Sequence, residues 1–262
     1  IELAAFQRDG YERARAIMER HGGVIYADGV GTGKTEIGLA FVEETTKESG
    51  QYALIVTPAQ LKRRWQERIV EAKLAAEVIS FNDLASDEQL ADSGTTNTAR
   101  RLTMQKDAYR LIVVDEAHAL RNEDTTWHRA MEKLLGGSEK KVLLLTATPI
   151  NNSLWDLFSL VMLFARHDLG LASAGIDSIR ELFNKAGANS GDPDELSPEV
   201  LYPVAEAVAV RRDRKFIEET YPGAQFPNGI PVRFPVSVVS TRRYDLDSTL
   251  PGLFDEITEQ IR

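Results

Sequence analysis

The chain has 262 residues, of which 43% are hydrophobic and 27% are charged, with a formal net charge of −9 at pH 7. No apolar run approaches the roughly 18 residues of a membrane-spanning helix, so the composition predicts a soluble protein of one or two domains without a membrane partner. The absence of cysteine excludes disulfides and thiolate metal sites, favours a cytoplasmic location, and leaves room for a local basic groove despite the acidic balance.

The N-terminal segment carries apolar residues at intervals of three and four between Leu3 and Met18, and it stops at Gly22 and Gly23. This pattern predicts an amphipathic helix or helix pair with a glycine stop. Gln7 has the amide donors and the carbonyl acceptor needed to read an adenine edge. An exposed helical glutamine is far commoner, so Gln7 alone is a weak signal.

A short apolar run, Val24–Tyr26, leads into a glycine-rich turn that opens a helix at Thr35. Strand, turn and helix in this order are typical of a phosphate-binding loop, whose backbone N–H groups and helix N-terminus face an anion. We expect Lys34 to reach the β and γ phosphates of ATP and Thr35 to ligate Mg²⁺. The residues expected to bind the nucleotide here are Asp28, Gly29, Val30, Gly31, Thr32, Gly33, Lys34 and Thr35. The alternative is an ordinary glycine turn.

A second buried strand, Ala53–Val56, precedes a helical pattern over residues 61–76 that carries Lys62, Arg63 and Arg64 near its start. By themselves these cations are best explained as a solvated helix face. Their position after a strand changes that weighting, because ligands gather at the strand-end loops of a parallel sheet.

The fourth predicted strand, Leu111–Val114, delivers Asp115 and Glu116. Two carboxylates at the end of a buried strand are costly without a partner, and a divalent cation supplies one. We expect Asp115 to hold Mg²⁺, usually through water, and Glu116 to orient and deprotonate the attacking water. The alternative is a helix N-terminus that happens to carry acids.

The other strands are expected at Val78–Ile79 and Val142–Leu145, the latter ending in a threonine-rich turn. In that turn, Thr146 and Thr148 are candidates for sensing the γ phosphate, although a strand-end turn with proline is the ordinary alternative. The polar stretch from Asn82 to Arg110 predicts an exposed excursion without assigned chemistry. Strands separated by helices predict an α/β fold with a mostly parallel sheet and helices on both faces.

Beyond Asp168 the pattern changes to helical pieces, a basic cluster over residues 210–215, a linker rich in proline and glycine, and a strand-like alternation over 232–239. We expect an ATP-binding lobe over residues 1–168, a helical extension and connector over 169–225, and a linker with the start of a second lobe over 226–262. Because Arg262 ends the chain inside a helical pattern with no cap, we expect a fragment.

Together these segments resemble the first ATPase lobe of the Swi/Snf family of superfamily-two motor proteins. Five stretches carry the resemblance: Phe6-Gln7 with Gly10, Ala27 to Thr35, Ile55 to Trp65, Asp115 to Asn122, and Leu144 to Ser153. The last two are the most specific. The order Thr146-Ala147-Thr148-Pro149 is similar to the bacterial branch that includes the RNA-polymerase-recycling translocase, and Arg211-Arg212 resembles the pair that leads into the family's second lobe.

The resemblance implies a RecA-like P-loop NTPase lobe and ATP-driven movement along duplex nucleic acid, with Gln7 at the adenine and His118 joining the coupling threonines. Nothing after Val232 matches the family's second lobe, which carries the arginine finger, so the fragment alone is expected to be weakly active. Left open are a module that binds nucleotide and docks a partner without hydrolysis, a strand-separating helicase, and RNA or a protein–DNA complex as the substrate. The residues expected at nucleic acid are Thr57, Pro58, Lys62, Arg63, Arg211 and Arg212.

Overall fold

The structure is a computed structural model that describes residues 1–150, 153–187, 189 and 196–234. It divides into two compact units, Ile1–Val232 and Arg233–Arg262, and everything below concerns the first. The strand predicted over residues 232–239 and the helical pattern before Arg262 lie almost wholly outside the described residues. Within the described part of the chain, no helix is long and apolar enough to cross a membrane.

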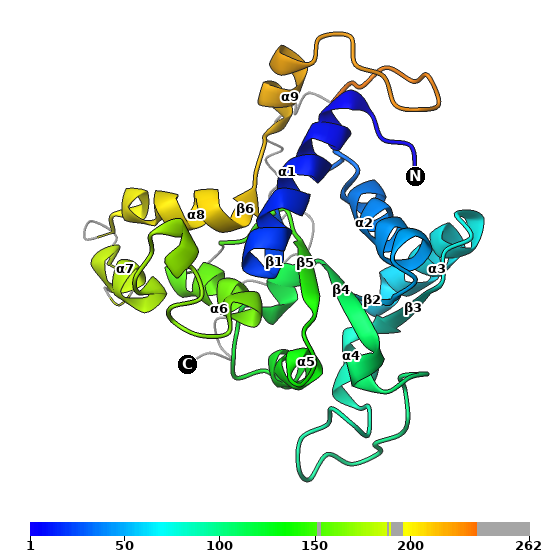
Figure 1. The fold of residues 1–262 in the computed structure, drawn as a ribbon, viewed down its shortest axis with the longest axis vertical. Coiled ribbons are helices and arrows are strands. Elements are labelled where there is room, and N and C mark those ends of the chain that lie inside the picture. Colours follow the sequence, from blue (N-terminus) through cyan, green and yellow to red (C-terminus); the bar gives the residue numbers. More distant parts are fainter. Residues whose placement is uncertain (151–152, 188, 190–195, 235–262) are drawn as a thin grey trace, which may run out of the picture. The chain divides into compact units, whose positions relative to one another are not determined.

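The described residues form one six-stranded parallel sheet in the order β3-β2-β4-β5-β1-β6 (Figure 1). The strands are β1 (Gly23–Tyr26), β2 (Tyr52–Thr57), β3 (Ala76–Ser80), β4 (Tyr109–Asp115), β5 (Lys141–Leu145) and β6 (Ala209–Val210). The first five contain the five predicted strands, and β6 extends the sheet with a pairing that the sequence did not indicate. Because all strands are parallel, their carboxyl ends meet at one edge, where the predicted site residues lie.

Helices cover both faces of the sheet, as predicted (Figure 1). The helices are α1 (Ala5–His21), α2 (Lys34–Glu43), α3 (Ala59–Glu71), α4 (Phe81–Ala85), α5 (Thr126–Leu135), α6 (Leu154–Ala165), α7 (Ile179–Lys185), α8 (Tyr202–Val208) and α9 (Arg214–Thr220). One hydrophobic cluster joins α1, α2 and α3 to the sheet through Met18, Ile37 and Trp65. A second hydrophobic cluster packs the five helices α4, α5, α6, α7 and α8 against the opposite face of the sheet.

The predicted helical extension belongs to this second cluster. Phe183 of α7 and Val204 of α8 are fully buried together with Leu144 of β5. The chain after Asp168 therefore completes the cover of one sheet face and then adds β6, while the domain limits assigned from the sequence stay a prediction.

The stretch from Asn82 to Arg110 is only partly the exposed excursion that we expected. Residues 93–98 are exposed, but Leu90 and Leu102 are buried, and so is Asp87, whose carboxylate accepts backbone hydrogen bonds from Arg101 (2.7 Å) and Leu102 (2.8 Å). A carboxylate satisfied by main-chain N–H groups lets a polar segment fold back onto the core. The expectation of a wholly solvated segment was wrong for this reason.

Candidate nucleotide-binding site

The glycine-rich loop joins β1 to α2 at the carboxyl edge of the sheet. Gly31 (φ 81°) and Gly33 (φ 84°) have left-handed backbone conformations, which side chains disfavour. A Cβ on Gly33 would also collide with the Gln7 amide, whose Nε2 donates to the Thr32 carbonyl oxygen at 3.0 Å. The Gln7 carbonyl oxygen accepts from the Ala4 N–H at 2.9 Å, and Gln7 is 1% exposed. Gln7 therefore braces the loop from α1, and its expected contact with adenine stays a prediction.

Lys34, the first residue of α2, turns back over the loop. Its Nζ donates to the carbonyl oxygens of Asp28 (2.8 Å) and Gly29 (3.1 Å). Burial lowers the pKa of Lys34, while the carboxylates of Glu116, Asp28 and Asp115 raise it. The acids at the end of β4 therefore lie near enough to the lysine to act on its charge, as the pattern predicted.

The carboxylate of Asp115 is held in place by two donors. Its Oδ1 accepts from the Glu116 N–H at 3.0 Å, and its Oδ2 accepts from the indole N–H of Trp65 at 2.7 Å. Trp65 lies on α3, is 1% exposed, and packs so closely on α2 that a Cβ on Gly38 would lie 2.8 Å from its ring. Sequence reasoning assigned no role to Trp65, although a buried indole N–H always needs a partner.

Glu116 has a left-handed backbone (φ 53°, ψ 47°), which is uncommon for a residue other than glycine. Its Oε2 lies 3.2 Å from Nδ1 of His118. Backbone conformations of this kind cluster at functional sites, where the surrounding structure holds them. The predicted general base and the predicted coupling histidine are thus neighbours.

The threonine turn after β5 lies between the loop after β1 and the acids after β4, because β5 pairs with both strands. Thr146 is buried, donates its N–H to the Tyr26 carbonyl oxygen at 3.1 Å, and accepts with Oγ1 from the Thr148 N–H at 3.2 Å. Thr148 is exposed. The structure therefore brings all three parts of the predicted ATP site to one place.

The residues present suit a magnesium ion that is shared with a nucleotide. Among the described residues, no group of three or more His, Asp and Glu side chains could form an all-protein metal cage. Mg²⁺ usually binds through one or two protein oxygens, several waters and substrate phosphates. Asp115 and Thr35 fit that kind of site, since each Asp115 oxygen keeps a free lone-pair direction beside its single hydrogen bond.

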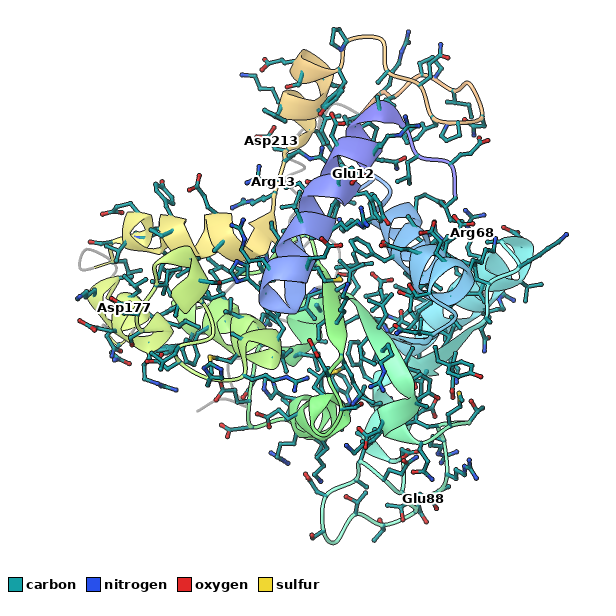
Figure 2. The ribbon with its side chains drawn as sticks, viewed as in Figure 1. Glu12, Arg13, Arg68, Glu88, Asp177 and Asp213 are labelled. Carbon is teal, nitrogen blue, oxygen red and sulfur yellow. The ribbon has the colours of Figure 1, made fainter. Side chains whose placement is uncertain are left out.

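A pocket of about 440 Å³ opens beside the loop. One wall is formed by Arg68, whose Nη2 lies 2.8 Å from each carboxylate oxygen of Glu36, and Figure 2 shows Arg68 where α3 faces α2. Phe226 and Pro227 of the later linker line the pocket as well. The pocket is lined by residues of α1, the loop, α2, α3 and the later linker, among them Gln7, Gly33, Glu36, Arg68, Phe226 and Pro227.

The residues predicted to touch nucleic acid lie at two places along the sheet edge. Lys62 pairs with Asp83 at 2.9 Å, and Arg63 is 89% exposed and lies 3.5 Å from Glu67. Thr57 is buried, and Pro58 precedes α3. These four residues lie at the end of β2 and the start of α3, whereas Arg211 and Arg212 follow β6, and three strands separate β2 from β6. With a strand spacing of about 4.8 Å, the strands β2 and β6 themselves are roughly 19 Å apart.

The expectation for Arg212 is corrected by its surroundings. Its side chain is 10% exposed, its guanidinium pairs with Asp28 at 2.6 Å, and it donates to the Phe6 carbonyl oxygen (2.7 Å) and the Tyr26 hydroxyl (2.8 Å). Donors occupied inside the protein are not available to a phosphate backbone. The Asp28 carboxylate, which is 0% exposed, is likewise held by Arg212, and its expected role at the nucleotide stays a prediction. Arg211 is exposed.

An all-parallel sheet with a phosphate-binding loop and an Asp-Glu pair at one edge defines a RecA-like P-loop lobe. Residues 6–174 match the model of the SNF2-related domain, and the chain belongs to this family. It is 33% identical over 165 residues to the uncharacterized ATP-dependent helicase YqhH of Bacillus subtilis, covering 61% of this chain and 29% of that protein. It is 27% identical over 245 residues to the probable ATP-dependent DNA helicase CHR12 of Arabidopsis thaliana, covering 85% and 22%.

The Sulfolobus solfataricus SWI2/SNF2 ATPase core solved in complex with dsDNA has the same fold, with a TM-score of 0.59 and 20% identity over 82% of this chain and 45% of that one. The chain thus spans less than a third of the two curated relatives and less than half of the solved core. These two curated relatives come from a bacterium and a plant, so the bacterial branch indicated by the threonine turn stays a prediction.

Proposed function

We propose that this chain is the ATP-binding lobe of a DNA-dependent ATPase of the Swi/Snf type, which couples Mg-ATP hydrolysis to movement on duplex nucleic acid. The observation that carries the proposal is the geometry of the sheet edge, where the glycine-rich loop after β1 and the Asp115-Glu116 pair at the end of β4 lie on strands that both pair with β5. Membership of the SNF2-related family supports it, as does a fold neighbour that was solved with duplex DNA.

In this proposal the loop N–H groups and the N-terminus of α2 receive the phosphates, and Lys34 leaves its two carbonyl partners for the β and γ phosphates. Thr35 and Asp115 would hold a magnesium ion, which would supply positive charge to the phosphate oxygens. Glu116 takes the proton of the attacking water. His118, beside the Glu116 carboxylate, and the Thr146-Thr148 turn then report the state of this site to the rest of the lobe.

The pocket between Gln7 and Arg68 takes the adenine in this proposal, because it opens directly beside the loop at Gly33. Duplex nucleic acid contacts the end of β2 and the start of α3, where Thr57, Pro58, Lys62 and Arg63 lie, and the exposed Arg211 is a further candidate. Contacts of this kind read the phosphate backbone rather than the base sequence. A second RecA-like lobe supplies the arginine finger, which is worth about 10³ to 10⁵ in rate.

The test compares ATP turnover and ATP binding in the intact protein, with and without duplex DNA. Lys34→Ala is expected to abolish nucleotide binding, and Glu116→Gln to keep binding while kcat falls by about 10² to 10⁴. Glu88→Gln, an equal change on an exposed residue of the segment after α4 (Figure 2), is the control and leaves both unchanged. ATP binding without turnover in the wild-type protein would instead support a docking module, and displacement of a labelled strand would support a helicase.

A further inference from the structure

The segment from Val210 to Arg214, between β6 and α9, runs alongside the phosphate-binding loop although 184 residues separate Arg212 from Asp28. The Ala27 N–H donates to the Val210 carbonyl oxygen at 2.7 Å, and the Gly29 N–H donates to the Arg212 carbonyl oxygen at 3.1 Å. These bonds continue the β1–β6 pairing past the end of both strands. The phosphate-binding loop is therefore hydrogen-bonded along one side to the segment that joins β6 to α9.

Arg212 is the centre of this contact. Its backbone N–H donates to Asp28 Oδ1 at 2.8 Å, and its Nε and Nη2 donate to the Asp28 carboxylate at 3.2 Å and 2.6 Å. The remaining donors reach the Phe6 carbonyl oxygen of α1 and the Tyr26 hydroxyl of β1. One guanidinium thus ties α1, the end of β1 and the β6–α9 segment together.

Space around this guanidinium is closed. A Cβ on Gly10, which faces Arg212 from α1, would collide with both the guanidinium and the Tyr26 hydroxyl. The collision is with the far end of a long side chain, but that end is fixed by the bonds above and has no room to move freely. Glycine is unfavourable inside a helix, so Gly10 indicates that the guanidinium needs this space.

Asp28 connects Arg212 to Lys34, the residue that is expected to bind phosphate. Its carbonyl oxygen accepts from Lys34 Nζ at 2.8 Å, while its carboxylate is held by Arg212. A buried ion pair contributes little net stability, because the cost of removing two charges from water offsets their attraction. A pair in this place therefore makes more sense as a device for fixing the loop than as a source of stability.

We propose that Arg212 is a positioning residue: through Asp28 it fixes the phosphate-binding loop, and it thereby couples nucleotide binding to the connector that follows β6. This rests on the proposed function for its nucleotide part. It replaces the expectation, drawn from the sequence, that Arg212 contacts nucleic acid. The end of α9 returns to α1, where the Tyr221 hydroxyl donates to Asp9 at 2.6 Å, so the connector is anchored on both sides of Arg212.

The experiment measures Mg-ATP affinity, duplex DNA affinity and amide hydrogen exchange of residues 27–35 in the intact protein. Arg212→Gln and Asp28→Asn are each expected to weaken nucleotide binding by at least about fivefold, and the double variant to be no weaker than the worse single one, as contacting residues show. Exchange in the loop rises in both single variants without nucleotide, while exchange in β2 does not. Lys215→Gln removes an exposed cation of α9, three residues after Arg212, and is the matched control, without effect on nucleotide affinity or loop exchange.

If Arg212→Gln does not fold, Arg212→Lys and Gly10→Ala replace it in the experiment, because both keep the positive charge at position 212. Both are expected to raise amide hydrogen exchange in the loop. Unchanged ATP affinity and loop exchange in the Arg212 variants would overturn the proposal. Loss of DNA affinity with normal ATP affinity would overturn it as well, and would return Arg212 to the nucleic-acid surface. Failure of the wild-type protein to bind ATP would contradict the proposed function, while the exchange measurement would still test the role of Arg212 on the loop.

Discussion

Two regions along the carboxyl edge of the sheet are built in different ways. At the ends of β1 and β4, Asp28 is buried and Asp115 half-buried, and each is held by a partner from a distant part of the chain, Asp28 by Arg212 and Asp115 by Trp65. At the end of β2, Arg63 is exposed, and its nearest carboxylate, Glu67, lies one helical turn away. The difference suits the two proposed ligands. The nucleotide phosphates would bind to a site whose side chains are already fixed, whereas the nucleic-acid backbone would bind to exposed charges that change partners easily.

Among the variants that test this comparison, the largest effect is expected when Asp115 loses its hydrogen bond from Trp65. Trp65→Phe keeps an aromatic ring in the buried position but removes the N–H that Asp115 Oδ2 accepts at 2.7 Å. A hydrogen bond to a charged group is worth about 1.5–3 kcal/mol, so kcat/KM for ATP is expected to fall by about 10- to 100-fold.

The matched control for this change is Trp127→Phe, which removes an equivalent N–H donated to Asn82 at 3.1 Å on the other face of the sheet. Its kcat/KM is expected to stay within about twofold, as for a surface change away from the site. Equal effects of the two variants would show that Trp65 acts only through folding stability, and the contrast between the two regions would then lose one of its supports.

A smaller effect is expected at the end of β2. Arg63→Gln is predicted to weaken duplex binding equally for all sequences and to reduce the slope of log K against log salt by about 0.9, because each phosphate contact releases counterions. Arg13→Gln, an equal change on the exposed face of α1 (Figure 2), is the control. An unchanged salt slope in Arg63→Gln would remove Arg63 from the proposed nucleic-acid surface.

The smallest effect concerns the ion pair of Lys62 and Asp83. The hydrogen bond from Lys62 lowers the pKa of Asp83, with further help from Ser80. A carboxyl whose pKa is lowered by folding stabilises the protein above its unfolded pKa of about 3.9, and this contribution is lost as the pH falls through the folded value. Because both side chains are about one third exposed, the pair is worth only about 0.2–1 kcal/mol.

Thermal unfolding of Asp83→Asn should therefore begin at a slightly lower temperature than that of the wild-type protein at pH 7, and the two unfolding temperatures should converge as the pH falls through the lowered pKa of Asp83. Asp177→Asn, on the exposed surface before α7 (Figure 2), is the control. Its unfolding temperature should equal that of the wild-type protein at pH 7 and at low pH. A difference that persisted at low pH would mean that Asp83 stabilises the fold through something other than its charge.

Local patterns were sufficient for much of this fold. The apolar runs at β1, β2, β4 and β5 and the order of strand, glycine turn and helix around Lys34 specify their own structure within a few residues. The Ser153 cap of α6, whose Oγ accepts from the Trp155 N–H at 3.1 Å, was predictable for the same reason.

Contacts between distant parts of the chain were not predictable in this way. The bond from Trp65 to Asp115 spans 50 residues and the pair of Asp28 and Arg212 spans 184, and neither leaves a periodic trace in the sequence. β6 has only two residues, so it lacks a pattern long enough to recognise. Arg212 was expected at nucleic acid because it belongs to a basic cluster, and no local pattern connects it with Asp28, its partner 184 residues away.

The most direct test of the central claim is an experimental structure of the intact protein with Mg²⁺ and a non-hydrolysable ATP analogue. The account predicts one magnesium ion bound by the Thr35 hydroxyl at about 2.1 Å and by Asp115 directly or through one water, with the phosphates on the N–H groups of the loop. Phosphates bound away from the loop, or a Thr35 hydroxyl and an Asp115 carboxylate too far apart to share one ion, would contradict it.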